Sequence, residues 1–185
     1  MFDKLFDLPA HPLLIHAPIV LLPIAAIVTV VLAAKPVWRA RAWGSWAMVG
    51  ALFVTLALLF AAKESGEAFN EGFEVAFGGV GADKHESLAN TTFIFTLAWF
   101  VAYTALIGYE FAVRRAAADA TATDRSAGAG GVGVDRPGGS RAASAALSSI
   151  AAVLAILATV WLIRTGHEGA RITWGPVVDQ LFPEG

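Results

Sequence analysis

The stretch HPLLIHAPIVLLPIAAIVTVVLAA, residues 11–34, decides the fold of this chain. It exceeds the roughly 20 apolar residues that a helix needs to cross the hydrocarbon of a bilayer. It is also too long for the apolar core of a signal peptide, which is about 7 to 15 residues. We therefore predict a retained membrane-spanning helix over residues 12–34. Pro12 suits the first helical turn, whereas Pro18 and Pro23 each remove a backbone hydrogen bond and should bend the helix.

Three further stretches have the same character, at residues 43–62, 88–113 and 142–163. Of the 185 residues, 57% are hydrophobic and 15% are charged, which is typical of an integral membrane protein. Each span should be helical, because lipid offers the backbone no other hydrogen-bond partner. The sequence thus predicts an all-α fold, a transmembrane four-helix bundle that forms one membrane domain over residues 1–185. A stripe of small residues in the fourth span should let a neighbouring helix pack closely: Ser148, Ala151, Ala155 and Ala158.

The loop charges predict an orientation. Lys35, Arg39 and Arg41 lie between the first two spans without an acid, and arginines follow the third span, whereas acids dominate residues 63–87. The positive-inside rule places the basic loops in the cytoplasm, so both termini should face outward from a bacterial inner membrane. Residues 116–140, rich in Ala and Gly, are interpreted as a flexible cytoplasmic linker. Glu110 should pair with Arg114, four residues on.

All four histidines are predicted at the outer end of the bundle. His11 and His16 lie at the start of the first span, His85 precedes the third and His167 follows the fourth. His16 lies about one turn into its span, where a polar side chain normally faces the bundle interior. We expect His16, His85 and His167 to form a shared site, with His11 mainly a helix-entry residue beside Pro12.

Neutral imidazoles from different helices can bind haem b through its iron, or a transition metal together with carboxylates. In the metal alternative the ligands are His16, His85 and His167 with one of Glu64, Glu67, Glu86 or Glu168, and the secondary candidates are His11, Asn90 and Arg164. There is no cysteine, which excludes thiolate sites. The net charge of −2 argues against nucleic acid as a partner. The sequence contains no recognisable nucleotide-binding or nucleophile motif, and whether the protein is an enzyme stays open.

Two alternatives remain open. Interfacial histidines often only hydrogen-bond a carbonyl, a headgroup or water, and then no cofactor binds and the protein is an accessory or scaffold subunit. Rings directed into separate carbonyl contacts would favour that alternative. A third class, a small transporter or proton-conducting protein, requires polar residues through the whole membrane depth. The middles of these spans offer only scattered Thr and Ser.

Several motifs together are similar to those of a bacterial family of four-helix membrane proteins catalogued as domain of unknown function 2231. They are HPLLIHAPIV, the glycine in KESGEAF, HESLAN before the third span and TGHEGARITWG after the fourth. The resemblance covers the chain except residues 116–140. It implies an inner-membrane protein associated with redox modules, because related domains occur fused to Rieske-type or c-type cytochrome domains. A redox-associated subunit that exchanges electrons with quinone or a respiratory partner is the function it favours, although this chain carries no redox domain and has Glu168 where relatives are more apolar.

Overall fold

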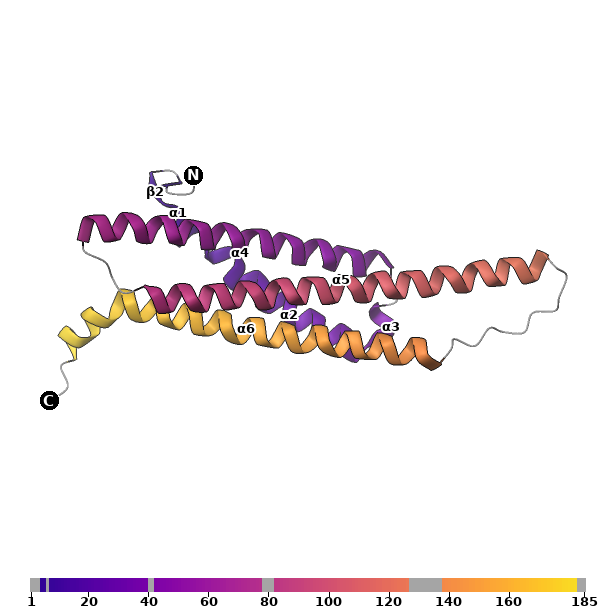
Figure 1. The fold of residues 1–185 in the computed structure, drawn as a ribbon. Coiled ribbons are helices and arrows are strands. Elements are labelled where there is room, and N and C mark those ends of the chain that lie inside the picture. The colour runs from indigo at the N-terminus through magenta and orange to yellow at the C-terminus, as the bar shows by residue number, and fades with distance from the viewer. Residues whose placement is uncertain (1–3, 6, 40–41, 78–81, 127–137, 183–185) are drawn as a thin grey trace.

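The computed structural model describes residues 4–5, 7–39, 42–77, 82–126 and 138–182 (Figure 1). Six helices and one short antiparallel strand pair make up this part of the chain, so the predicted all-α class is confirmed. The elements in order are β1 (Lys4–Leu5), β2 (Leu8–Pro9), α1 (Ala10–Leu14), α2 (His16–Ala34), α3 (Pro36–Arg39), α4 (Ala42–Phe77), α5 (Asp83–Ser126) and α6 (Gly138–Leu181).

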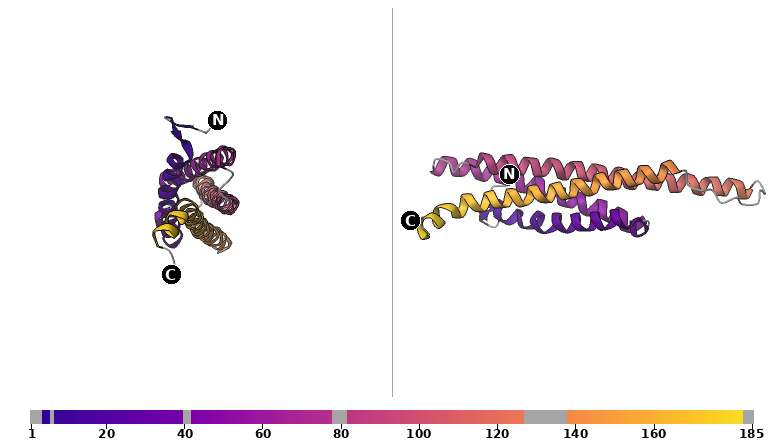
Figure 2. Two further views of the ribbon diagram at one scale, coloured as in Figure 1. Left: turned by 90° about the vertical axis from the view of Figure 1, so that its left-hand side faces the viewer. Right: turned by 90° about the horizontal axis from the view of Figure 1, so that it is seen from below.

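Four long helices form the bundle. Helix α2 packs against α4 and α6, and α5 packs against the same two helices, so α2 and α5 lie diagonally opposite each other (Figure 2). Strand β2, α1, the end of α4, the start of α5 and the end of α6 all lie at one end of the bundle (Figure 1). We call this the histidine end, and the opposite end, near α3, the arginine end.

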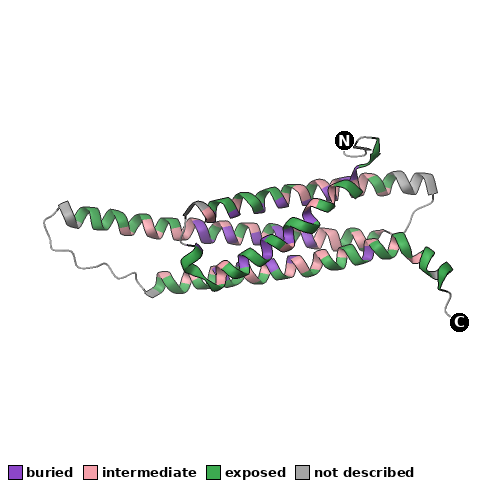
Figure 3. Cartoon of the chain, turned by 180° about the vertical axis from the view of Figure 1, so that it is seen from behind, coloured by how far each residue is buried: buried purple, intermediate pink, exposed green. Residues whose placement is uncertain are grey.

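The chain is a multi-pass membrane protein. Within the described residues, four helices are long and apolar enough to cross a membrane: Ala10–Ala34, Gly44–Glu71, Asp83–Thr123 and Gly139–Val178. Their outward faces are exposed and carry large apolar side chains such as Ile27, Ile94 and Ile163 (Figure 3). Such a surface would be unfavourable in water and is suited to lipid.

The core follows the small-residue stripe of α6. Ala151, Ala155 and Ala158 are fully buried, and Ser148 is nearly so, which confirms the predicted packing face. The large side chains of the same cluster include Trp99 and Tyr103 of α5, together with Leu22 of α2 and Leu52 of α4. Small residues on one helix therefore leave room for bulky ones on its neighbours.

The first span is divided at Ile15, between α1 and α2, although Ile15 keeps α-helical dihedral angles of φ −66° and ψ −24°, and the bend stays a prediction. Pro18 has no N–H to donate to the carbonyl of Leu14, so one backbone hydrogen bond is missing here, whereas those from Ile15 to His11 and from Ile19 to Ile15 are present. Pro23 lies within α2 without ending it. Helix α1 contacts α4, and α2 contacts both α4 and α6.

Three helices are longer than their predicted spans. Helix α4 continues to Phe77, and α6 continues to Leu181. Helix α5 runs through residues 116–126, and α6 begins at Gly138, so both ends of the expected linker are helical. Alanine has the highest helix propensity, and the alanine-rich sequence after Arg115 explains the extension of α5. The rest of that segment, residues 127–137, lies outside the described residues.

Candidate functional site

Two histidines meet at the histidine end. His11 lies in α1 and His85 lies in the first turn of α5, and their ring centres are 6.3 Å apart with the planes nearly perpendicular. Phe69 of α4 stacks on His11, with the ring centres 6.5 Å apart. Both rings are partly buried. The structure therefore brings together two imidazoles that belong to different spans.

Each ring is oriented by a backbone carbonyl of a neighbouring helix. The Nδ1 of His11 lies 2.8 Å from the carbonyl oxygen of Ala62, and the Nδ1 of His85 lies 3.0 Å from that of Thr165. A carbonyl only accepts, so each Nδ1 carries the proton and donates it. In a neutral ring the lone pair is then on Nε2, and among the described residues neither Nε2 has a hydrogen-bond partner. This arrangement is the usual one for a metal-binding imidazole.

A glycine faces each ring. A Cβ added to Gly66 of α4 would lie 3.0 Å from Cε1 of His11, and one added to Gly169 of α6 would lie 3.0 Å from Cε1 of His85. These separations are tighter than ordinary van der Waals contact. The two glycines therefore allow the helices to approach the imidazoles closely.

The two contacts repeat the same pattern in the two halves of the chain. In each half the accepting carbonyl precedes the glycine by one helical turn, from Ala62 to Gly66 and from Thr165 to Gly169. The histidine-bearing segments also correspond, as H-x-x-L-x-H from His11 and H-x-x-L-x-N from residue 85. This internal repeat is the sequence signal that could have identified His11, rather than His16, as the counterpart of His85.

The other two histidines lie apart from this pair. His16 begins α2 and His167 lies in α6, and both side chains are exposed. No hydrogen bond joins either of them to His85 within the described residues. Of the predicted set of His16, His85 and His167, only His85 belongs to the histidine pair, and its partner is His11.

Three of the four predicted carboxylate ligands have cationic partners, and the fourth, Glu86, is exposed. Glu168 is 3% exposed and pairs with Lys84 at 2.9 Å and with Arg171 at 2.6 Å. Glu64 and Glu67 both pair with Lys63. Across the described ranges no group of three or more His, Asp or Glu side chains is arranged to hold a metal ion.

The two remaining secondary candidates lie outside the histidine pair. Arg164 lies over the ring of Trp161, 4.8 Å from the ring centre. The cations that pair with Glu168 are Lys84 and Arg171. Asn90 is partly buried on α5. Its place corresponds to that of His16 in the internal repeat.

A second polar cluster lies at the arginine end and was not predicted. Arg39 of α3 is 3% exposed, and its Nε and Nη2 donate to Glu110 at 3.0 and 2.8 Å. Its Nη1 donates to the carbonyl of Leu32 and to Ser148. Glu110 also pairs with Arg114 at 3.1 Å, as the sequence predicted. In the sequence, Arg39 served only to predict the orientation, because Glu110 and Ser148 are distant from it along the chain.

Comparisons with known proteins add no relative. Neither a family model, nor a curated protein, nor a solved structure matches this chain. The four-helix membrane architecture agrees with what the family resemblance implies, and membership of that family stays a prediction. The fold and the histidine pair define a class: a four-helix membrane protein with two imidazoles at one end of its bundle.

Proposed function

We propose that this chain is a redox-associated membrane subunit in which His11 and His85 together bind a transition-metal ion or the iron of haem b. The observation that carries the proposal is the convergence of two imidazoles whose Nδ1 atoms are both engaged by backbone carbonyls. That engagement leaves both Nε2 lone pairs for a ligand.

The separation of the rings supports a shared ion. Two metal–nitrogen bonds of about 2 Å, added to the distance from each nitrogen to its ring centre, span roughly 6 Å. The observed distance between ring centres is 6.3 Å. A separation of this size allows one ion between the two Nε2 atoms, with its other ligands from outside the chain. Haem b would in addition require space for its macrocycle between the two rings.

The charges around the pair favour neutral ligands over carboxylates. Lys84 and Arg171 engage Glu168, and Lys63 engages Glu64 and Glu67. Hard, oxygen-seeking cations such as Ca²⁺ and Mg²⁺ would lack their usual ligands here. Imidazole suits iron, copper, nickel and zinc, and the first two would support electron transfer with a quinone or a partner protein.

The scaffold alternative is favoured by the same carbonyl contacts. His11 ties α1 to α4 through Ala62, and His85 ties α5 to α6 through Thr165. These bonds are what a purely structural role of the histidines predicts. They do not by themselves require the two rings to face each other.

The deciding experiment is metal analysis and an absorption spectrum of the protein purified in detergent, before and after incubation with haem or with Cu, Fe, Ni or Zn salts. We expect His11→Ala and His85→Ala each to abolish uptake. The matched controls are His16→Ala and His167→Ala, which remove exposed imidazoles and should leave uptake unchanged.

Two results would refute the proposal. If the wild-type protein takes up neither haem nor metal, the scaffold function is the remaining alternative. In that case His11→Ala and His85→Ala should lower only thermal stability. Equal loss of uptake in all four histidine variants would show that binding is not located at the pair.

For location, we propose a bacterial inner membrane with the histidine end facing outward. The basic residues near the arginine end and the acidic residues 63–87 near the histidine end support this orientation. Cysteine labelling of single-site variants at exposed positions near each end, such as Leu8→Cys and Val37→Cys, tests it. Labelling by an impermeant reagent from the outside is expected only at residue 8.

A further inference from the structure

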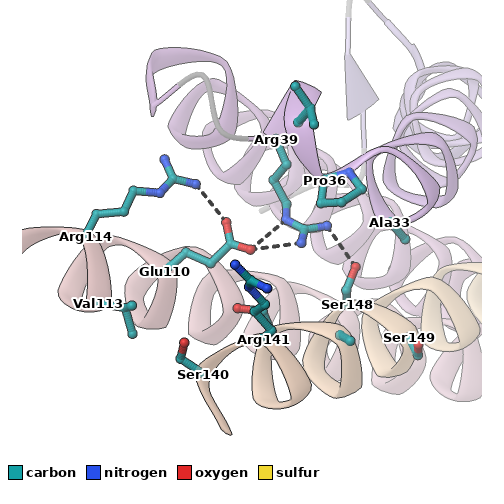
Figure 4. Close-up of a pocket in the computed structure, with 13 residues that line it drawn as sticks. Ala33, Pro36, Arg39, Glu110, Val113, Arg114, Ser140, Arg141, Ser148 and Ser149 are labelled. Carbon is teal, nitrogen blue, oxygen red and sulfur yellow. Dashed lines mark hydrogen bonds and ion pairs between the residues drawn. The ribbon is translucent and has the colours of Figure 1, made fainter. Parts of the chain in front are cut away.

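A cavity of about 480 Å³ lies at the arginine end, between α2, α3, α5 and α6 (Figure 4). Its walls combine apolar side chains, among them Ala33, Val37 and Val113, with arginines and serine hydroxyls. The volume is within the usual range for a small-molecule site. This cavity is at the opposite end of the bundle from the histidine pair, so it is independent of the proposed function.

The cavity carries an excess of positive charge. Arg39, Arg114 and Arg141 line it, and among the described lining residues Glu110 is the one acid. The carboxylate of Glu110 is shared between Arg39 and Arg114. Arg141, in contrast, has no ion pair within the part of the chain that the structure describes. Its guanidinium reaches from α6 toward the carboxylate of Glu110 without a marked contact (Figure 4).

The polar groups suit a phosphate oxygen in particular. Ser140, Ser144 and Ser149 line the cavity beside the guanidinium groups, and hydroxyl and guanidinium groups both donate to phosphate. Ser140 and Arg141 belong to the first turn of α6, where the helix dipole also favours an anion. The buried Arg39 and its hydrogen bond to Ser148 fix the floor of the site, because those groups are held by four hydrogen bonds.

We propose that this cavity binds a phosphate group, from either an anionic phospholipid headgroup or a free phosphate compound. The excess guanidinium charge would engage the phosphate oxygens, and the apolar wall would contact a glycerol or acyl segment where the source is a lipid. Basic pockets between membrane-spanning helices are a recognised means of holding anionic headgroups.

The test compares Arg141→Gln with Arg115→Gln. Arg115 is exposed on α5 beside Arg114 and does not line the cavity, so the second variant makes the same charge change without touching the site. Retained phosphatidylglycerol is counted by native mass spectrometry, and affinity is measured by titration in detergent at physiological salt. We expect Arg141→Gln to weaken binding about tenfold and Arg115→Gln to leave it nearly unchanged.

A competition arm separates the two sources. Displacement of phosphatidylglycerol by millimolar inorganic phosphate, but not by chloride at equal ionic strength, would support a site for free phosphate compounds. Retention of the lipid under the same conditions would support a headgroup site. Equal weakening by both variants, or no binding of either probe to the wild-type protein, would overturn the proposal.

Discussion

Replacing Glu110 by Ala should be among the most destabilising single changes in this protein. Arg39 is 3% exposed and loses the one ionic partner that it has among the described residues, together with hydrogen bonds from Nε and Nη2 at 3.0 and 2.8 Å. The contacts of Nη1 with Leu32 and Ser148 remain, but they do not neutralise the charge. Leaving a buried charge without its partner costs about 3–5 kcal/mol. We expect a loss of that size in the free energy of unfolding.

The assay is reversible unfolding in mixed micelles, followed by far-UV circular dichroism. Arg114→Ala is the control, because Arg114 contacts the same carboxylate from a position that is one-third exposed, and such a pair contributes about 1 kcal/mol or less. The double variant Arg39→Met with Glu110→Met should recover most of the stability, since it removes both charges. A Glu110→Ala variant no less stable than Arg114→Ala would refute the claim that Arg39 depends on Glu110.

Two further changes test the packing. Gly169→Ala should be less stable than Gly166→Ala in thermal unfolding, because the new Cβ at residue 169 would press on the ring of His85. A Cβ at residue 166 meets nothing within 4 Å, so Gly166→Ala should raise the free energy of unfolding by about 0.5–1 kcal/mol. Equal stabilisation by both variants would contradict the close contact at Gly169. Tyr103→Phe should raise stability by about 1 kcal/mol in the same assay, because the buried hydroxyl of Tyr103 has no hydrogen-bond partner among the described residues. A clear loss of stability in this variant would instead indicate a partner for the hydroxyl.

Much of the fold could be predicted from sequence because the signals are local. A span is defined by some twenty consecutive apolar residues, and the packing face of α6 by Ala151, Ala155 and Ala158 at helical spacing. The helix ends were less predictable. Residues beyond the hydrocarbon no longer need to be apolar, so hydropathy marks where the lipid ends and not where the helix ends.

The histidine pair was only half predictable. Depth in the membrane favoured His16, but His16 is exposed at the start of α2, whereas His11 contacts the carbonyl of Ala62 in α4. The partners of His11 and His85 are carbonyls of Ala62 and Thr165, and a backbone acceptor leaves no trace in residue identity. The signals in the sequence are the matching glycines, Gly66 and Gly169, and the matching segments H-x-x-L-x-H and H-x-x-L-x-N.

The arginine end shows a similar limit. The spacing of Glu110 and Arg114 on one helix predicted their ion pair, which the structure contains. The stronger partner, Arg39, comes from another helix and a distant part of the sequence. Helical spacing describes neighbours on one helix only, so contacts between helices need the arrangement of the bundle itself.

The repeated histidine contact has a consequence for how the molecule is put together. The bond from His11 to Ala62 closes within the first half of the chain, and the bond from His85 to Thr165 closes within the second. Each imidazole therefore makes its carbonyl contact within its own half of the chain, and neither contact requires the other half. The two rings come within 6.3 Å of each other only after the two halves dock. The distance between the two imidazoles therefore reports whether the two halves have docked, and a spectroscopic probe on either ring could measure it.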